Sequence, residues 1–232
     1  MKRSRLPFLA LLALAAALPF VRAEEVDPYD QKKVPLEVQP NDPGLTKIVL
    51  VAGRQSHGPG DHEFFAGCAI VMNLLKQTPG VFPVMARDGW PKDPEKSFAG
   101  AKAVVFYMDG GGGHPIIQKD HKEVVARLME KKIGFVNLHY AVEYPKNQSD
   151  HILNWLGGYY ETGFSTNPHW VANFKKMPEH PITRGVKPFE IKDEWYFNIR
   201  FRPEMQSVTP ILTATPPDSE RRTDAAKAFK GR

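Results

Sequence analysis

Residues 47–53 read KIVLVAG, a short apolar run rich in β-branched residues that stops at the polar sequence RQSH. Runs of this kind are typical of buried strands. The same pattern recurs as VFPVM at 81–85, AVVFYM at 103–108 and IGFVNL at 133–138. Helical patterns separate these runs, at about 61–77 and 115–132. Strands that alternate with helices of this length predict βαβ units, and therefore a mostly parallel sheet with helices on both faces.

A histidine follows three of these four expected strands. His57 comes after the first, His114 follows the third beyond Asp109 and four glycines, and His139 follows the last directly. In open α/β sheets, ligands bind in the crevice beyond the carboxyl ends of parallel strands. We therefore expect the three imidazoles to meet at one site although they lie far apart along the chain.

The loop after the first expected strand reads RQSHGPGDHE at 54–63 and carries a second histidine, His62. Its glycines allow the backbone to turn closely around a ligand. Asp61 is expected to cap the following helix, which would place His62 in the first helical turn, near the crevice. An ordinary polar loop with a helix cap is the alternative, but two histidines in six residues favour a substrate-binding role for His57 and His62.

The glycine run after Asp109 suits a close approach of backbone to a ligand. Gly111 and Gly112 are expected to present N–H groups to a sugar or an oxyanion, beside Asp109 and His114. The run lacks the Gly-Lys-Ser/Thr ending of a phosphate loop, and contiguous glycines do not match a dinucleotide-binding fingerprint.

His139 stands where a sharp turn after a strand presents the nucleophile in hydrolase-like and amidotransferase-like folds. Neither a cysteine nor a serine occupies that position, so a covalent acyl-enzyme is not expected. A histidine there can act as a general acid or base, or bind a metal through a neutral ring nitrogen. We take His139 as the first catalytic candidate, with Tyr140 beside it as a substrate contact.

Residues 193–198 read DEWYFN and place acids next to aromatic rings. Such a combination suits a sugar, whose apolar face packs on an aromatic ring while its hydroxyls bond to carboxylates. We predict catalytic roles for Glu194 and Tyr196 and a substrate contact for Trp195. A strand edge with Trp195 buried is an equally good interpretation.

A divalent metal such as zinc is a candidate cofactor, because imidazole and carboxylate groups are its usual ligands. The candidate ligands are His57, His62, His114 and His139. None has a diagnostic spacing such as two histidines one helical turn apart, so the sequence leaves both the metal and its ligands open.

The first 23 residues match a secretory signal peptide: a basic start, an apolar stretch at 6–20 and a small-x-small ending at Ala23. We expect cleavage after Ala23, no stable membrane span thereafter, and a periplasmic or secreted location. Removing four basic residues lowers the formal net charge from +5 to +1 (5 − 4), so nothing favours nucleic acid as a partner.

Residues 24–45 are rich in proline and acids and predict an extended arm. The lone cysteine, Cys68, fits a buried structural thiol in a helix.

Four segments together resemble the ThuA-like (trehalose utilisation) domain family. They are the strand and loop at 47–63, Asp109 with its glycines, the stretch GFVNLHYAVE at 134–143, and DEWY at 193–196. The resemblance covers about residues 46–214 and places the domain at 46–232. It implies a flavodoxin-like three-layer α/β fold, similar to that of class I glutamine amidotransferases but without their catalytic cysteine. Such domains usually continue beyond the point where this chain stops, so we expect the domain to be incomplete at its C-terminus.

The resemblance also implies a link to carbohydrate catabolism, with a small sugar or keto-sugar as partner. The leading hypothesis is an enzyme that uses acid–base chemistry centred on His139, with or without a metal, in a hydrolase, lyase or isomerase reaction. The alternative is a carbohydrate-binding module without catalysis on the same fold. A glutamine amidotransferase is disfavoured by the missing cysteine. The sequence leaves the sugar, the reaction and the oligomeric state open.

Overall fold

A computed structural model describes residues 31–221, 224 and 227. The predicted signal peptide and the start of the predicted arm lie outside the described residues. Among the helices that are described, none is long and apolar enough to cross a membrane. The described residues from Val34 onward belong to one compact unit.

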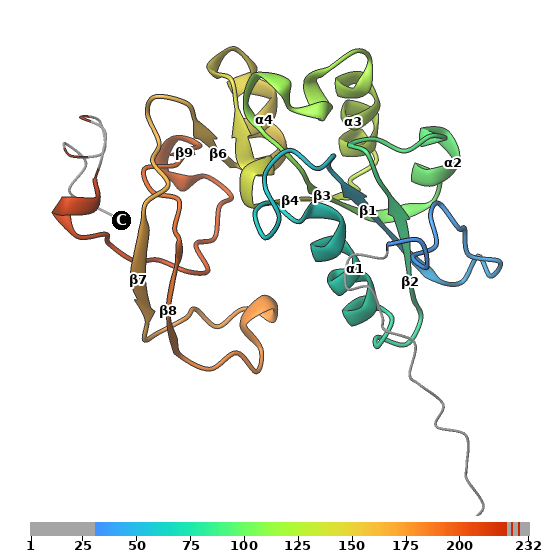
Figure 1. Cartoon of the computed structure of the whole chain (residues 1–232), viewed down its shortest axis with the longest axis horizontal. Helices are drawn as coiled ribbons and strands as arrows, with labels where there is room; N and C mark the ends of the chain where they lie inside the picture. The colour runs from blue at the N-terminus through green and yellow to red at the C-terminus, as the bar shows by residue number, and fades with distance from the viewer. Residues whose placement is uncertain (1–30, 222–223, 225–226, 228–232) are drawn as a thin grey trace, which may run out of the picture. The chain divides into compact units, whose positions relative to one another are not determined.

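The central element is a four-stranded parallel sheet with the order β2-β1-β3-β4, shown in Figure 1. Its strands are β1 (Thr46–Ala52), β2 (Val81–Ala86), β3 (Ala101–Tyr107) and β4 (Gly134–Leu138). Ala52 pairs with Tyr107, which in turn pairs with Leu138. The carboxyl ends of β1, β3 and β4 are therefore level with one another, and the segments that follow them start from the same edge of the sheet.

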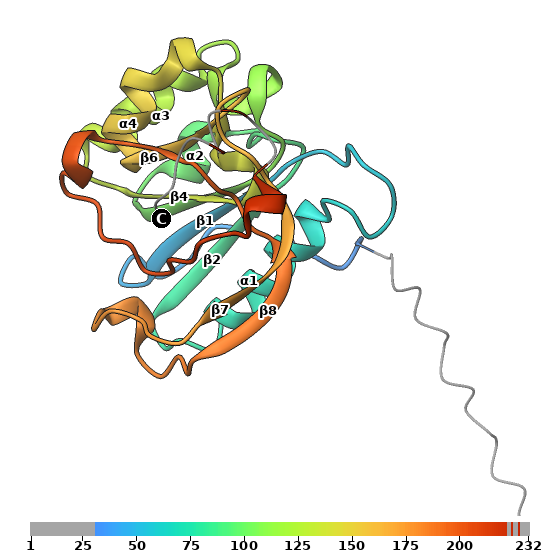
Figure 2. The same ribbon diagram turned by 90° about the vertical axis from the view of Figure 1, so that its left-hand side faces the viewer.

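Side chains alternate between the two faces of the sheet and build two separate cores. Val49 and Val51 of β1 belong to one core, whereas Leu50 and Ala52 belong to the other. The first core is covered by α2 (Pro94–Phe98), α3 (His121–Glu130) and α4 (Ser149–Leu156), and the second by α1 (Phe64–Leu75). In Figure 2, α1 lies across the sheet from α3 and α4. The expected flavodoxin-like architecture, with helices on both faces, is confirmed.

The second half of the chain is less regular. A small sheet has the order β5-β6-β9, from β5 (Glu143–Tyr144), β6 (Gly158–Glu161) and β9 (Arg200–Phe201). The strands β7 (His169–Phe174) and β8 (Phe189–Glu194) pair antiparallel and run side by side at the left of Figure 1. Short 3₁₀ turns occur in the connections on both sides of β4 and in the second half of the chain: Gly111–Gly113, Pro115–Ile117, His139–Val142, Lys146–Gln148, Pro181–Thr183, Pro203–Met205 and Asp218–Glu220.

Several expected elements differ from the observed ones. The helix expected from 115 starts as a 3₁₀ turn and becomes α-helical only at His121. The sequence VTPILTA at 208–214 also predicts a strand, but the structure has none there. The helix α2 and strand β7 were not expected. The first helix begins at Phe64 with Glu63 at its N-cap, so Asp61 does not cap it. Cys68 is buried as predicted, and burial raises the pKa of its thiol to about 12.

The described part of the predicted arm holds no strand or helix, yet from Val34 it belongs to the same unit as the sheet. Glu37 makes most of the connection. Its N–H donates to the carbonyl of Met85 at 2.7 Å, and its carboxylate accepts from the N–H of Lys92 at 2.9 Å and the hydroxyl of Ser97 at 3.1 Å. These bonds fix the segment that precedes β1.

Candidate functional site

Side chains from three loops meet at the carboxyl edge of the parallel sheet. The β1–α1 loop supplies His57 and His62, the turn after β3 supplies Asp109, and the turn after β4 supplies His139. The His62 ring centroid lies 3.8 Å from that of His57 and 4.9 Å from that of His139. The level ends of β1, β3 and β4 thus bring together groups that are up to 82 residues apart (139 − 57).

Two of these histidines adopt a backbone conformation that non-glycine residues seldom use. Both His62 and His139 have φ = 52°, in the left-handed region. Such conformations are energetically costly and concentrate at functional sites. At His139 the conformation makes the abrupt change from β4 into the 3₁₀ turn His139–Val142 and directs the side chain across the edge of the sheet.

The first group consists of His57, His62 and Asp109. The Oδ1 atom of Asp109 lies 3.6 Å from Nδ1 of His62 and 3.8 Å from Nδ1 of His57. Each of the three residues offers one ligand atom, and these atoms all lie within 4.8 Å of one another. Within the described residues, this is the one group of histidines, cysteines and acids close enough to hold a metal ion.

The second group consists of His139, Glu194 and Tyr196. Nε2 of His139 lies 3.6 Å from Oε2 of Glu194, and the ring of Tyr196 lies 5.5 Å from that of His139. Asn167 donates from Nδ2 to the other oxygen of Glu194 at 2.7 Å, which fixes the carboxylate. Sequence reasoning missed Asn167, because only the pairing of β7 with β8 brings it opposite Glu194.

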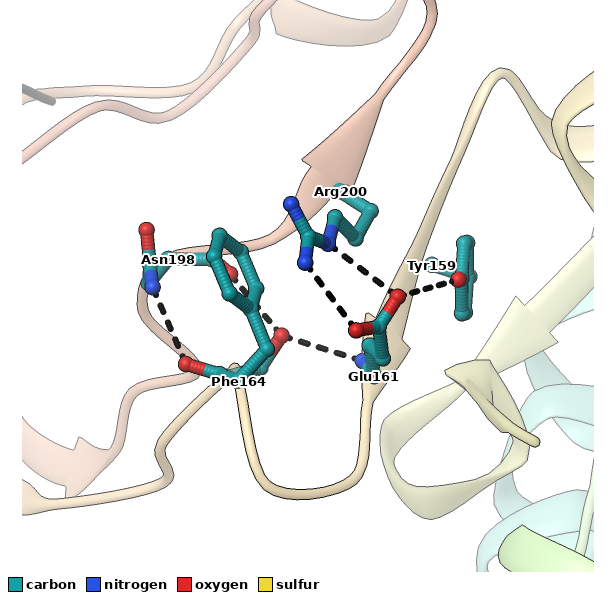
Figure 3. Close-up of polar contacts among 6 residues, drawn as sticks. Tyr159, Glu161, Phe164, Asn198 and Arg200 are labelled. Carbon is teal, nitrogen blue, oxygen red and sulfur yellow. Dashed lines mark hydrogen bonds and ion pairs between the residues drawn. The ribbon is translucent and has the colours of Figure 1, made fainter. Parts of the chain in front are cut away.

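A buried polar network holds the segment that carries Glu194 and Tyr196 (Figure 3). Arg200 donates to both carboxylate oxygens of Glu161, at 3.1 and 3.0 Å, and the Tyr159 hydroxyl donates to the same carboxylate at 2.7 Å. The Ser165 hydroxyl accepts from the N–H of Glu161 at 3.0 Å and donates to the carbonyl of Asn198 at 2.8 Å. The network therefore joins β6 to the chain on the C-terminal side of Tyr196.

The electrostatics of the second group favour a neutral imidazole beside a neutral phenol. Burial lowers the pKa of His139 and outweighs the carboxylate of Glu194, which acts in the opposite direction. Burial also raises the pKa of Tyr196, with Glu194 and Glu143 adding to the effect. His139 is thus able to accept a proton near neutral pH, and Tyr196 keeps its hydroxyl proton as a hydrogen-bond donor.

His114 does not join either group, which corrects the prediction that it binds substrate or metal. Its side chain is fully buried and stacks on Tyr144, with ring centroids 4.2 Å apart. Nδ1 accepts from the N–H of Ile116 at 3.2 Å, so Nε2 carries the proton and donates to the carbonyl of Ala141 at 3.0 Å. Burial lowers its pKa to about 4. His114 is a neutral structural residue with both ring nitrogens already bonded.

The glycine run packs against the turn that follows His139. A Cβ atom on Gly110 would lie 2.3 Å from the carbonyl oxygen of Tyr140, so only glycine fits there. Gly111 is buried beside Glu143, whereas Gly112 is exposed with open space around its Cα. The ring of Tyr140 lies 5.5 Å from that of His62, next to the first group. The main chain of this run therefore does approach another group closely at Gly110, but that group is the main chain of Tyr140 and not a ligand.

Two of the cavities beside the site reach its histidines or its carboxylates. One of about 420 Å³ is lined by His139 and Glu194 together with Trp195 and Tyr196. Trp195 also packs on Phe174, with ring centroids 5.0 Å apart, so one part of the indole is used in the interior. The other cavity, of about 550 Å³, reaches Asp109 and is lined by a cluster of basic side chains and by aromatic rings: Arg54, Arg87, Lys92, Lys119, Trp90 and His121.

Comparison with known proteins supports one family. The sequence model of the family described as "ThuA: Trehalose utilisation" matches residues 49–228. The crystal structure of a ThuA-like protein from Bacteroides uniformis ATCC 8492 is 17% identical to this chain, with a TM-score of 0.49; the match covers 74% of this chain and 66% of that one. This chain thus spans just under two thirds of the length of that relative. No curated protein matches the chain.

Proposed function

The chain belongs to the ThuA (trehalose utilisation) family, and we propose that it acts in carbohydrate catabolism on a keto-sugar, by acid–base chemistry centred on His139. The observation that carries the proposal is the contact between Nε2 of His139 and Glu194, beside Tyr196 and open to a cavity of about 420 Å³. Removal of a proton from carbon needs a base, a group that orients the base and a hydrogen-bond donor for the developing oxyanion. His139, the carboxylate of Glu194 and the hydroxyl of Tyr196 are the candidates for these three roles.

A ketone suits this arrangement because it acidifies the neighbouring C–H bond. The imidazole of His139 takes that proton, the C–H electron pair forms a C=C bond, and the carbonyl π pair moves onto oxygen. The Tyr196 hydroxyl donates a hydrogen bond to the developing oxyanion. Glu194 stabilises the imidazolium that results.

The intermediate enolate has two outcomes with this set of groups. In the isomerisation of an α-hydroxyketone, the enolate oxygen takes the proton of the neighbouring hydroxyl, and His139 returns its proton to the carbon that carried the original carbonyl. In an elimination, the enolate electron pair expels an oxygen substituent on the carbon β to the ketone, and the leaving oxygen takes the proton from His139. Both routes balance without a covalent enzyme intermediate. This agrees with the absence of a cysteine at position 139 and with the burial of Cys68, and it disfavours glutamine amidotransferase chemistry.

A carbohydrate-binding module without catalysis is the second candidate. It is favoured by the aromatic lining of the same cavity, where Trp195 and Tyr196 offer ring surfaces to a sugar. A binder of this kind needs the rings and the carboxylate but not a titrating base. The two candidates therefore differ in what His139 does.

We also propose that the protein acts outside the cytoplasm. The support is the N-terminal sequence alone, with its basic start, apolar stretch and Ala23 cleavage pattern. N-terminal sequencing of protein secreted by an expressing cell tests this, and a mature chain that starts at Glu24 is the expected result.

Incubation of the protein with 3-keto-glycosides, followed by mass spectrometry of the products, tests the enzymatic proposal. We expect turnover by the unmodified chain and a loss of about 100-fold or more in His139→Gln, because general acid–base catalysis contributes that much. His151→Gln is the matched control, since His151 is exposed on α4. Saturable binding with no product would favour the binding module, and equal turnover by both histidine variants would exclude His139 as the base.

A further inference from the structure

Two buried polar atoms at the sheet edge have no hydrogen-bond partner. They are Oδ1 of Asp109 and Nδ1 of His62, which face each other at 3.6 Å. That separation exceeds the usual length of a charge-assisted N–H···O bond, about 2.7–2.9 Å. Buried polar atoms are nearly always bonded, and an unpaired carboxylate oxygen is especially costly. The arrangement is incomplete without a further atom between these groups.

We propose that His57, His62 and Asp109 bind a divalent metal ion. Two imidazoles and one carboxylate form a ligand set that Zn²⁺ and similar ions accept. Zinc–nitrogen and zinc–oxygen bonds of about 2.0–2.1 Å in tetrahedral geometry separate two ligand atoms by roughly 3.3 Å. The separations of 3.6 and 3.8 Å between Asp109 and the two histidines need only small side-chain shifts to reach that value.

The ligand set differs from the one that the sequence suggests. Of the four predicted histidine ligands, His114 is buried and already bonded, and His139 pairs with Glu194. Asp109, expected to contact substrate, takes the third position. With a carboxylate in place of an imidazole, the net charge of a divalent ion together with its three ligands is +1 instead of +2.

The site has the character of a catalytic rather than a structural metal centre. Structural zinc sites have four protein ligands, whereas catalytic sites have three and leave a position for water or substrate. The His57 side chain is 43% exposed, so the group opens toward solvent on that side. The His62 ring also contacts that of His139, so an oxygen bound at the open position would lie near the proposed base.

The nitrogen of His57 that faces Asp109 also contacts Ser56. The Ser56 hydroxyl lies 2.7 Å from Nδ1 of His57, which is the atom 3.8 Å from Asp109. A metal ion bound through Nδ1 takes the place of this hydrogen bond, so its loss opposes part of the binding free energy.

The inference that a metal ion binds depends only on these contacts. The inference about which substrate the ion holds rests on the proposed function. A keto-sugar offers a carbonyl and a neighbouring hydroxyl as two adjacent oxygens. The inferred ligand class for the open position is therefore an α-hydroxyketone, held by the ion beside His139.

Calorimetric titration of untagged, EDTA-stripped protein with ZnCl₂ and with MnCl₂ tests the site. We expect one equivalent to bind for at least one of the two ions. Asp109→Asn and His57→Gln keep the size of the side chain and should each weaken binding by about 10-fold or more, since even outer-shell changes cost 10–100-fold. His151→Gln is the control, because His151 is exposed on α4, and it should stay within about threefold of the unmodified chain.

Two results would overturn the inference: no stoichiometric binding of either ion, or binding that persists unchanged in both Asp109→Asn and His57→Gln. Circular dichroism of each variant verifies that it is folded. The inference and the proposed function fail separately. Metal binding without turnover would support the metal site and contradict the proposed reaction. Turnover without metal binding would contradict the metal site and support the proposed reaction.

Discussion

His114 and His139 follow neighbouring parallel strands, β3 and β4, yet their surroundings are opposite. His114 is fully buried, neutral and bonded through both ring nitrogens to main-chain groups. His139 keeps 29% of its side chain exposed, adopts a left-handed backbone conformation and faces Glu194 and His62. A position just beyond a strand end thus locates a residue in the fold but does not decide what it does.

The difference comes from the length and composition of the two connections. After β3, six residues, four of them glycine, allow the chain to pack against the turn that follows His139, and His114 is carried into the interior. After β4 the histidine stands directly at the strand end. The following predictions extend this contrast between a structural and an exposed histidine.

The largest difference is expected in stability. His114→Ala removes two hydrogen bonds and a stacked ring from the interior, and we expect a loss of about 2–4 kcal/mol in the free energy of unfolding. His139→Ala should change it by less than about 1 kcal/mol. Urea unfolding followed by circular dichroism measures both. Equal losses in the two variants would remove the distinction.

The same contrast predicts a pH dependence of stability. The pKa of His114 is about 4 in the folded protein and about 6.5 in the unfolded chain, so the unfolded state binds more protons between these values. Stability should therefore fall as the pH drops from 6.5 to 4, by roughly 3 kcal/mol from this residue alone. His114→Asn should lack that contribution. Urea unfolding of both proteins between pH 7 and pH 4 tests it, and parallel curves would contradict the buried neutral imidazole.

The glycine run provides a smaller test of how the His114 loop packs. Gly110→Ala would bring a Cβ atom to 2.3 Å from the carbonyl oxygen of Tyr140, a main-chain atom that cannot move aside freely. We expect a destabilisation of about 1–3 kcal/mol. Gly112→Ala meets nothing within 4 Å and should be nearly neutral. Thermal unfolding compares the two, and a neutral Gly110→Ala would show that the two loops are not in close contact.

The smallest expected effect concerns the titration of His139 in metal-stripped protein. Burial lowers its pKa, and Glu194 partly offsets this by favouring the imidazolium. Glu194→Gln removes that offset and should lower the pKa of His139 further. NMR titration of the imidazole protons measures the change. A rise in the pKa would mean that the carboxylate does not act on His139.

Much of the fold was predictable because a buried strand can be recognised from its own short apolar sequence. The runs at 47–53 and 103–108 are apolar on both sides, which favours a sheet covered on both faces. The structure confirms the prediction, because both runs form central strands of the parallel sheet. The family prediction is likewise confirmed by the match to residues 49–228. The β7–β8 pair and the missing strand at 208–214 depend instead on contacts between distant segments.

The location of the candidate site was predictable from the sequence, but which of its residues contact one another was not. That His57 and His139 share an edge followed from the predicted parallel sheet, because each histidine comes after the carboxyl end of a strand. The burial of His114 did not, because it depends on how Gly110 fits against Tyr140. Asn167, which fixes Glu194, carries no signal in the sequence. Single polar residues acquire their roles from tertiary neighbours, and periodicity does not encode those.

Exchange of the proton beside the ketone of a 3-keto-glycoside in D₂O, followed by NMR, tests the acid–base role of His139 most directly, because it reports proton removal whatever product follows. The unmodified chain should catalyse deuterium incorporation. The rate with His139→Gln should be lower by a factor of about 100 or more, while His151→Gln should match the unmodified chain. Equal exchange rates with the unmodified chain and with His139→Gln, or no exchange above the uncatalysed rate, would contradict the account.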